Sequence, residues 1–498
     1  MKRSQESSGD ETRQTQKTKT ENKAEVRSSP IYLTTIEDLP SEENVDTVGL
    51  RDLIGLEDMV SMFQFNFMFT LPFILEKLHP RARSVVNSYF IYGRKPIGDD
   101  HTGDMLRAER EAFGSKQNIT IDGETLMNAY ATHHTKMMVL FFKTKDGEEE
   151  AQVVIHTANL IEFDWSNMTQ GVWKSPRLKL KSRGESTNSD SSSVGIKFGN
   201  DFLKYLRKYR NKSAKLAAEM ISKYDFSPVE AIFVASAPGN YNTNDPEYGQ
   251  WGIVKLQKEI AKFSKSSENG TESRTGYVVA QVSSIATLGA TDSYLGPIVT
   301  NALNGRPFFD KVTEKTSPLK LIFPSVEDVA DSLEGYVSGS SIHFKRQSAP
   351  QLKQLEYMKL LLHRWHALKA GRQRCAPHIK TYTKVINNGQ ELEWLLLTSA
   401  NLSKHAWGTV NKTKANHWIQ SWECGVLIHA NAFRGKNNSL VPVYKSNNSN
   451  VEGQKDKNTI CVRMPYDLPL QKYTPRDVIW SANENYTEPD WRGNKWIL

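Results

Sequence analysis

Two short segments of the chain contain the same reactive side chains in the same order. The first runs from His134-Thr135-Lys136 to Asn159, and the second runs from His378-Ile379-Lys380 to Asn401, about 244 residues further along. An imidazole can attack phosphorus or transfer a proton, an ammonium group neutralises phosphoryl oxygens, and a carboxamide donates hydrogen bonds to them. The repeat therefore predicts chemistry on a phosphodiester that requires no metal ion.

Each copy of the repeat is predicted to be a β-hairpin. An apolar run follows each lysine, and Asp146-Gly147 or Asn388-Gly389 separates it from a second apolar run. Asp-Gly and Asn-Gly between strand-like runs are strong hairpin signals. Residues i and i+2 of a strand point to the same face. The histidine and lysine of each copy therefore share a pocket, close to the asparagine that follows the neighbouring strand.

A single His-x-Lys triplet carries little information, because chance supplies about one in a chain of this length. His343-Phe344-Lys345 is a third example, and it has neither the hairpin nor the asparagine. A surface histidine beside a solvated lysine is the simpler interpretation of any one copy. Two copies with matching hairpins and matching asparagines favour one shared catalytic site.

The composition indicates a folded, basic protein of two or three domains. The chain has 498 residues, 38% of them hydrophobic, and a formal net charge of +8, which favours a polyanionic partner such as nucleic acid. The three cysteines, Cys375, Cys424 and Cys461, are odd in number and lack metal-ligand spacing, so neither a zinc site nor disulfides are expected. The N-terminus lacks the apolar core of a secretory signal, and an intracellular protein is expected.

Strand-like and helix-like patterns alternate along the chain, which predicts layered α/β domains. Residues 1 to about 30 are polar and are expected to be a disordered tail, and tracts near 179–193 and 265–275 are expected to be surface loops. Alternating apolar residues from Phe63 to Leu71 predict one buried strand. Helical spacing is found in Phe198, Phe202, Tyr205 and Tyr209, and again in Leu352, Leu355, Leu362 and Trp365.

The paired motif resembles the phospholipase D superfamily, in which two His-x-Lys motifs meet at a domain interface. The Asp that usually follows the lysine after four residues is replaced here by Phe141 and Val385. The tyrosyl-DNA phosphodiesterase branch also lacks that Asp and has the asparagine. Further segments from about residue 32 to the C-terminus resemble this branch, among them Phe63–Phe67, Ser332–Tyr336, Ala400–Lys404 and Pro465–Pro469.

The resemblance implies two similar α-β-α sandwich domains, related by a pseudo-two-fold axis and sharing one active site at their interface. The expected organisation is a tail at 1–31, a first domain at 32–229 and a second domain at 230–498. The implied catalytic residues are His134 as nucleophile, His378 as general acid and base, and Lys136, Lys380, Asn159 and Asn401 as ligands of the phosphoryl oxygens. The residues alone do not decide which histidine attacks.

Gln170 and Glu423 also match active-site positions of the family. A carboxylate that is hydrogen-bonded to an imidazole makes that ring more basic than a hydrogen-bonded carboxamide does. The difference between Glu and Gln is therefore a hypothesis for why two similar histidines have unequal roles.

Three residues match positions of the family near DNA, namely Ser341, Ser403 and Tyr130. A capping or solvent-exposed serine is the alternative for Ser341 and Ser403, and a packed aromatic is the alternative for Tyr130. The basic run Lys174, Arg177, Lys179, Lys181 and Arg183 is expected to be either solvated surface or an extension of the DNA track.

The expected partners are single-stranded, nicked or duplex DNA with a 3′ tyrosyl adduct and the attached topoisomerase I-derived peptide. No cofactor, metal or membrane contact is expected, and the resemblance implies a monomer in the nucleus. Lys2-Arg3 and Lys17-Thr18-Lys19 are possible import signals, although a solvated tail is the simpler interpretation. The rival functions are a phospholipase D that acts on lipids, a general nuclease, and a non-catalytic DNA-binding scaffold.

Overall fold

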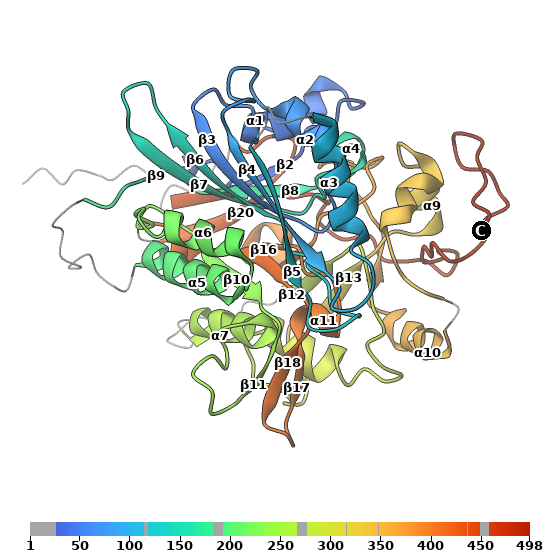
Figure 1. Ribbon diagram of the computed structural model, residues 1–498. Coiled ribbons are helices and arrows are strands. Elements are labelled where there is room, and N and C mark those ends of the chain that lie inside the picture. The colour runs from blue at the N-terminus through green and yellow to red at the C-terminus, as the bar shows by residue number, and fades with distance from the viewer. Residues whose placement is uncertain are drawn as a thin grey trace, which may run out of the picture.

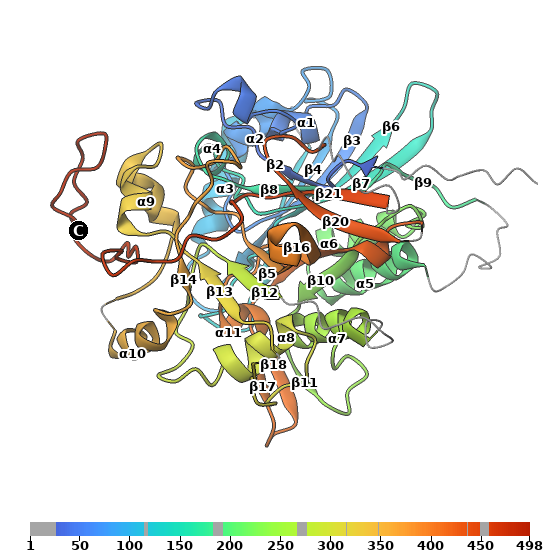
Figure 2. The same ribbon diagram turned by 180° about the vertical axis from the view of Figure 1, so that it is seen from behind.

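The computed structural model consists of two large β-sheets that pack together, with helices on their outer faces and beside their contact (Figures 1 and 2). It describes residues 26–113, 118–182, 193–265, 276–314, 316–346, 348–435, 437–448 and 458–498. Each sheet is built mainly from one half of the chain. The sheet of the N-terminal half, called the first sheet below, lies above the sheet of the C-terminal half in Figure 1.

The first sheet has the strand order β2-β8-β7-β6-β3-β4-β5, and β9 pairs with β7. Strands β3, β4 and β5 are parallel, whereas β6, β7, β8 and β2 continue from β3 in antiparallel pairs. The strands are β2 Ile31–Leu33, β3 Met59–Phe65, β4 Asn87–Arg94, β5 Ile119–Thr125, β6 Met137–Lys143, β7 Glu149–His156, β8 Gly171–Lys174 and β9 Leu178–Lys179.

The second sheet has the order β1-β21-β20-β16-β15-β12-β13-β14, and β19 pairs with both β16 and β10. A separate sheet, β11-β18-β17, projects at the bottom of Figure 1. The strands of the second sheet are β1 Val26–Arg27, β10 Ile232–Ser236, β12 Gly276–Gln281, β13 Leu319–Ile322, β14 Leu362–His363, β15 Thr381–Ile386, β16 Glu391–Thr398, β19 Glu423–His429, β20 Asn438–Val443 and β21 Asn458–Arg463. The separate sheet contains β11 Gly239–Asn242, β17 Thr409–Asn411 and β18 Asn416–Ile419.

The two large sheets repeat one pattern around their central hairpins. In the first sheet β3 pairs with parallel β4 on one side and leads through β6 and β7 to β8 on the other. In the second sheet β12 pairs with parallel β13 and leads through β15 and β16 to β19. The hairpins β6–β7 and β15–β16 are therefore equivalent, which confirms the expected pair of similar domains.

Three apolar clusters hold the layers together. The largest joins the inner faces of the sheets and the helices α5 Val194–Lys208 and α6 Lys212–Ile221. A second covers the outer face of the second sheet, and a third covers the outer face of the first. The other helices are α1 Leu50–Ile54, α2 Leu71–Lys77, α3 His101–Phe113, α4 Glu162–Ser166, α7 Gly252–Lys265, α8 Asn301–Leu303, α9 Val326–Ala330, α10 Ala349–Met358 and α11 Lys404–Trp407.

The N-terminal part differs from the expected tail. Residues 1–25 lie outside the described ranges, but Val26–Arg27 form β1, which pairs with β21, and the Arg27 guanidinium forms an ion pair with Glu230 at 3.2 Å. Main-chain pairing and this ion pair order a segment that has few apolar side chains. The part of the expected tail that the structure describes, residues 26–31, is therefore ordered, and the other domain boundaries stay predictions.

Two further predictions about local structure are wrong in part. The strand expected to run from Phe63 to Leu71 ends at Phe65, and Leu71 begins α2. The second helical pattern ends with α10 at Met358, because Leu362 lies in β14 at the parallel edge of the second sheet. Most of both predicted polar loops, residues 183–192 and 266–275, lies outside the described residues.

Within the described ranges, no helix is long and apolar enough to span a bilayer.

Candidate active site

Residues that flank the two hairpins line one cavity, to which both halves of the chain contribute. Its volume is about 640 Å³, and its wall contains His134 and Asn159 from the first half and His378, Asn401 and Glu423 from the second. Ser341, Ser403 and Tyr130 line the same cavity. The structure thus brings together residues that the sequence separates by more than 200 positions.

Each histidine is fixed by main-chain contacts to the opposite half. The His134 amide donates to the carbonyl oxygen of Trp422 at 2.9 Å, and the His378 amide donates to that of Thr169 at 3.1 Å. Trp422 immediately precedes Glu423, and Thr169 immediately precedes Gln170, which stand at equivalent positions in β19 and just before β8. Each half therefore supplies one histidine and the polar group that supports the other histidine.

The His134 imidazole contacts a carboxylate. Its Nδ1 atom lies 2.9 Å from Oε2 of Glu423, and the same oxygen accepts a hydrogen bond from the Ser399 hydroxyl at 2.5 Å. Burial lowers the pKa of His134, and Glu423 opposes that shift. A proton on Nδ1 directed at Glu423 leaves the Nε2 lone pair free, which is the state required of a nucleophile.

The His378 imidazole contacts both a carboxamide and a carboxylate. Its Nδ1 atom lies 2.9 Å from Nε2 of Gln170 and 3.2 Å from Oδ2 of Asp164. The Gln170 side chain also donates to Asp164 at 3.2 Å. The main-chain N–H of Asn159 donates to the same carboxylate at 2.6 Å. Burial, with the charge of Lys380, lowers the pKa of His378 to about 3, against the opposing effect of Asp164.

Asp164 requires a correction of the hypothesis about unequal supports. The contrast between Glu423 and Gln170 suggested that one histidine has a carboxylate and the other has none. In the structure both histidines have a carboxylate within 3.2 Å, because α4 brings Asp164 beneath His378. The asymmetry that remains is that Gln170 and the Asn159 amide also donate to Asp164, whereas the Ser399 hydroxyl donates to Glu423.

The two lysines form a buried positive centre. Burial lowers the pKa of Lys136 to about 8, and burial together with the neighbouring charge of Lys136 lowers the pKa of Lys380 well below its usual value. Both lysine ammonium groups donate to the main-chain oxygen of the histidine two residues earlier. Burial would raise the pKa of Glu423 and Asp164, but the nearby histidines and Lys136 lower both. Both lysine side chains are fully buried and neither lines the cavity, so their positive charge would attract an anion in the cavity without forming part of its exposed wall.

The two asparagines have different environments. The Asn401 side-chain oxygen accepts hydrogen bonds from the Ser283 and Ser284 amides at 3.1 and 2.9 Å, which leaves its NH₂ group as a donor for the cavity. The Asn159 side-chain oxygen is buried and has no hydrogen-bond partner within the described part of the chain. Ser283 and Ser284 line the cavity, and the sequence patterns did not reveal them.

The expected DNA-contacting residues lie at the cavity but differ in their environments. Tyr130 is 78% exposed, so it is not a packed core aromatic. The Ser403 hydroxyl caps α11 by accepting from the His405 amide at 3.0 Å, as in the alternative interpretation, while Ser341 ends a short 3-10 helix. Arg177 of the basic run stacks on Phe142 at 3.2 Å, and neither it nor its described neighbours in that run line the cavity.

Two further residues of the cavity wall were not predicted. The centroid of the Phe67 ring lies 5.8 Å from the centroid of the His134 ring and 5.7 Å from Nζ of Lys136. It is 43% exposed and therefore available to a substrate. His343, from the third His-x-Lys triplet, also lines the cavity, although that triplet has no hairpin.

Two equivalent sheets whose hairpins contribute histidine and asparagine to one cavity are the arrangement expected of a phospholipase D-like enzyme. A model of the tyrosyl-DNA phosphodiesterase family matches residues 30–474. A probable tyrosyl-DNA phosphodiesterase of Schizosaccharomyces pombe is 32% identical over 95% of this chain and 96% of its own length. Tyrosyl-DNA phosphodiesterase 1 of Arabidopsis thaliana is 28% identical over 94% of this chain and 76% of its own. The chain belongs to the tyrosyl-DNA phosphodiesterase family.

Solved structures agree on the fold. The crystal structure of the yeast tyrosyl-DNA phosphodiesterase superposes with a TM-score of 0.68 at 20% identity, covering 91% of this chain and 99% of the yeast chain. At this identity the match supports the architecture, and the chemistry is argued from the cavity.

Proposed function

We propose that this enzyme hydrolyses the bond between a topoisomerase I-derived tyrosine and a DNA 3′ phosphate, and leaves a 3′-phosphate end. The observation that supports this most is the pair of histidines, each held by a carboxylate, with two buried lysines beside them. One histidine can attack while the other protonates the leaving group, and the lysines can neutralise the oxygens between them.

In the first step, Nε2 of His134 attacks phosphorus, and a phosphorus–nitrogen bond forms as the bond to the tyrosine oxygen breaks. His378 donates its proton to that oxygen. A phenol, with a pKa of about 10, leaves more readily than a sugar alkoxide, so the tyrosyl bond breaks in preference to the DNA backbone. The product of this step is a phosphohistidine on the DNA 3′ end.

In the second step, His378 accepts a proton from water, and the oxygen of that water attacks phosphorus. The phosphorus–nitrogen bond breaks, and the lone pair returns to His134. Burial and the charge of Lys380 lower the pKa of His378 to about 3, which makes the imidazole neutral at pH 7. A substrate phosphate in the cavity offsets the charges of Lys380 and Lys136 that help to lower this pKa, so binding of substrate favours the protonated acid.

Metal independence is part of the proposal. Lys136, Lys380 and the NH₂ group of Asn401 supply positive charge and donors that a metal ion supplies in other phosphodiesterases. Within the described residues, there is no group of three or more His, Cys, Asp or Glu side chains placed to hold a metal ion. We also propose a nuclear monomer that accepts single-stranded, nicked or duplex DNA.

Substrate comparison tests the proposal. A 3′-phosphotyrosyl oligonucleotide, the same oligonucleotide without the adduct, and phosphatidylcholine are incubated with the enzyme in the presence of EDTA. Rapid release of tyrosine with a 3′-phosphate product is expected from the first alone. Faster hydrolysis of the lipid, or of the unmodified strand, would contradict the proposed substrate.

A further inference from the structure

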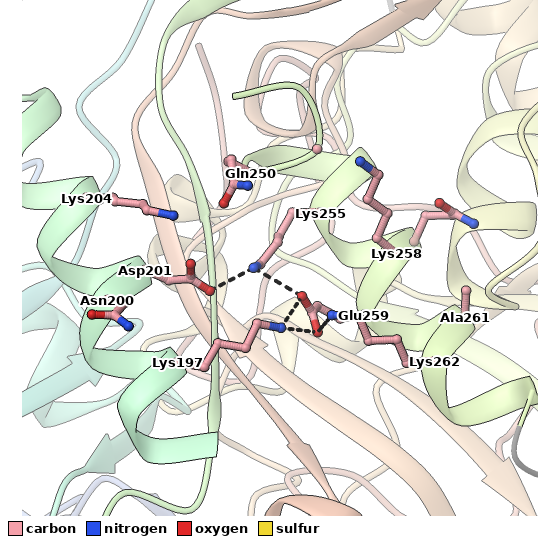
Figure 3. A pocket seen from close by; sticks show the side chains of 12 residues that line it. Lys197, Asn200, Asp201, Lys204, Gln250, Lys255, Lys258, Glu259, Ala261 and Lys262 are labelled. Carbon is pink, nitrogen blue, oxygen red and sulfur yellow. Dashed lines mark hydrogen bonds and ion pairs between the residues drawn. The ribbon is translucent and has the colours of Figure 1, made fainter. Parts of the chain in front are cut away.

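A second cavity, of about 680 Å³, lies between α5 and α7, which come from different halves of the chain (Figure 3). It shares no lining residue with the catalytic cavity. Two carboxylates, Asp201 and Glu259, line it together with five lysines, which leaves three positive charges in excess. The lysines are Lys197, Lys204, Lys255, Lys258 and Lys262.

The floor of this α5–α7 cavity is a fixed ionic network. Lys255 is 4% exposed and bridges Asp201 at 2.7 Å and Glu259 at 3.1 Å. Glu259, which is 3% exposed, also accepts from Lys197 at 2.6 Å and from Lys262 at 2.8 Å. A buried carboxylate shared by three ammonium groups cannot neutralise all of them, so the network holds positive charge in a defined place.

The remaining lysines face the open side of the cavity. In Figure 3, Lys204 extends from α5 toward α7, and Gln250 and Lys255 point into the space beside its ammonium group. Lys204 and Lys258 are exposed, and Lys258 donates to the Tyr248 carbonyl oxygen at 3.2 Å, which fixes its position on the opposite wall. Burial and the charges of Lys255 and Lys262 lower the pKa of Lys258, as expected for ammonium groups that lack enough anions.

We propose that the α5–α7 cavity binds a ligand with more than one phosphate group, separately from the catalytic cavity. Lysine ammonium groups bind phosphate as point charges, and a volume of this size suits a ligand as large as a nucleotide rather than one small ion. A solvated lysine surface would need neither the buried Lys255–Glu259 network nor a concave shape. The inference does not depend on the reaction proposed above.

Two sources can provide such phosphates, namely a free polyphosphate and the backbone of a DNA strand. Calorimetric titration with sodium tripolyphosphate measures the first. Binding of an unmodified single-stranded oligonucleotide at several salt concentrations measures the second. The test variant combines Lys204→Gln and Lys258→Gln, and the matched control combines Lys212→Gln and Lys215→Gln, which remove two charges from exposed positions of α6.

The test variant is expected to bind tripolyphosphate at least about tenfold more weakly than the wild type, while the control binds as tightly as the wild type. If a DNA strand is the natural source, the slope of log K against log salt also falls by about 1.4 for the test variant, or about 0.7 for each lost contact. An unchanged slope with lost tripolyphosphate binding identifies a free ligand. Equal tripolyphosphate binding by all three proteins, or an equal loss in both variants, would overturn the inference.

Discussion

Replacing Glu423 with glutamine removes the negative charge beside the His134 imidazole and keeps a hydrogen-bond acceptor of the same size. In the native site, Oε2 of Glu423 lies 2.9 Å from Nδ1 of His134. A hydrogen bond to a charged group contributes about 1.5–3 kcal/mol and a neutral one about 1 kcal/mol, so at least about 0.5 kcal/mol is lost when positive charge develops on the ring. Coulomb's law for charges about 4 Å apart at an effective dielectric constant of about 20 gives an upper bound of about 4 kcal/mol. The expected rate loss is therefore between about twofold and about 1000-fold.

Rapid-quench single-turnover kinetics with a 3′-tyrosyl oligonucleotide measures this loss for formation of the covalent adduct. Glu423 raises the pKa of His134 against the effect of burial, so removing its charge lowers that pKa further. The acidic limb of the pH profile of kcat/KM is therefore expected to move to lower pH in Glu423→Gln. Ser399→Ala is the matched control, since it removes a hydrogen bond to Glu423 and keeps the charge, and a smaller loss is expected. Unchanged formation and hydrolysis rates in Glu423→Gln would refute the role of the carboxylate.

Asp164→Asn is expected to slow cleavage of a tyrosyl ester but to have much less effect on a p-nitrophenyl ester. The reason is that a more acidic phenol leaves without protonation by His378. Equal losses in the single-turnover rates for the two esters would argue against Asp164 as the residue that supports the acid. Phe67→Ala is expected to raise KM for the tyrosyl oligonucleotide about three- to tenfold through loss of aromatic contact, and an unchanged KM would exclude that contact. Glu259→Gln is expected to lower the free energy of urea-induced unfolding at pH 7 by about 3 kcal/mol, whereas Glu247→Gln, in a more exposed pair with Lys208, should cost less than about 1 kcal/mol. Burial would raise the pKa of Glu259, but the lysines lower it from 4.5 to about 2. The contribution of Glu259 to the free energy of unfolding is therefore complete above pH 4.5 and is lost as the pH falls toward 2. If wild type and Glu259→Gln lost stability in parallel through that range, this account would be contradicted.

The paired hairpins could be predicted from sequence because their signals are local. An apolar run and the Asp146-Gly147 turn signal predict the strands β6 and β7. His134 and Lys136 lie just before β6 and not within it, so the period-two argument does not explain their placement. The second copy gave the same result at β15 and β16. A repeated local pattern therefore predicted both hairpins and the histidines and asparagines that line the cavity, whereas Lys136 and Lys380 are buried and do not line its wall.

Asp164 could not be predicted in the same way. It lies in the short helix α4, and its contact with His378 crosses from one half of the chain to the other. No periodicity or spacing along the sequence describes such a contact, because it depends on how two domains pack. Gln170 and Glu423 were recognised by resemblance alone, and the structure was required to assign each to its histidine.

Phe67 shows how a regular pattern can mislead. Its alternation with Phe63 and Phe65 predicted one long strand, but the chain leaves the sheet at Asn66. The Asn66 side chain donates to the Ala158 carbonyl oxygen at 3.1 Å, and the Asn66 carbonyl oxygen lies 3.0 Å from Nδ1 of His133. These tertiary contacts outweigh strand propensity and turn an apolar ring into part of the cavity wall.

The most direct test of the proposed mechanism is to locate the covalent intermediate. The enzyme is mixed with a 3′-tyrosyl oligonucleotide, quenched at a pH that preserves phosphoramidates, digested and analysed by mass spectrometry, with His134→Ala and His378→Ala as comparison variants. The mechanism predicts a DNA 3′ phosphate attached to His134, more of this adduct in His378→Ala because its hydrolysis slows, and none in His134→Ala. An adduct on His378, or tyrosine release by His134→Ala at the rate of the wild type, would contradict it.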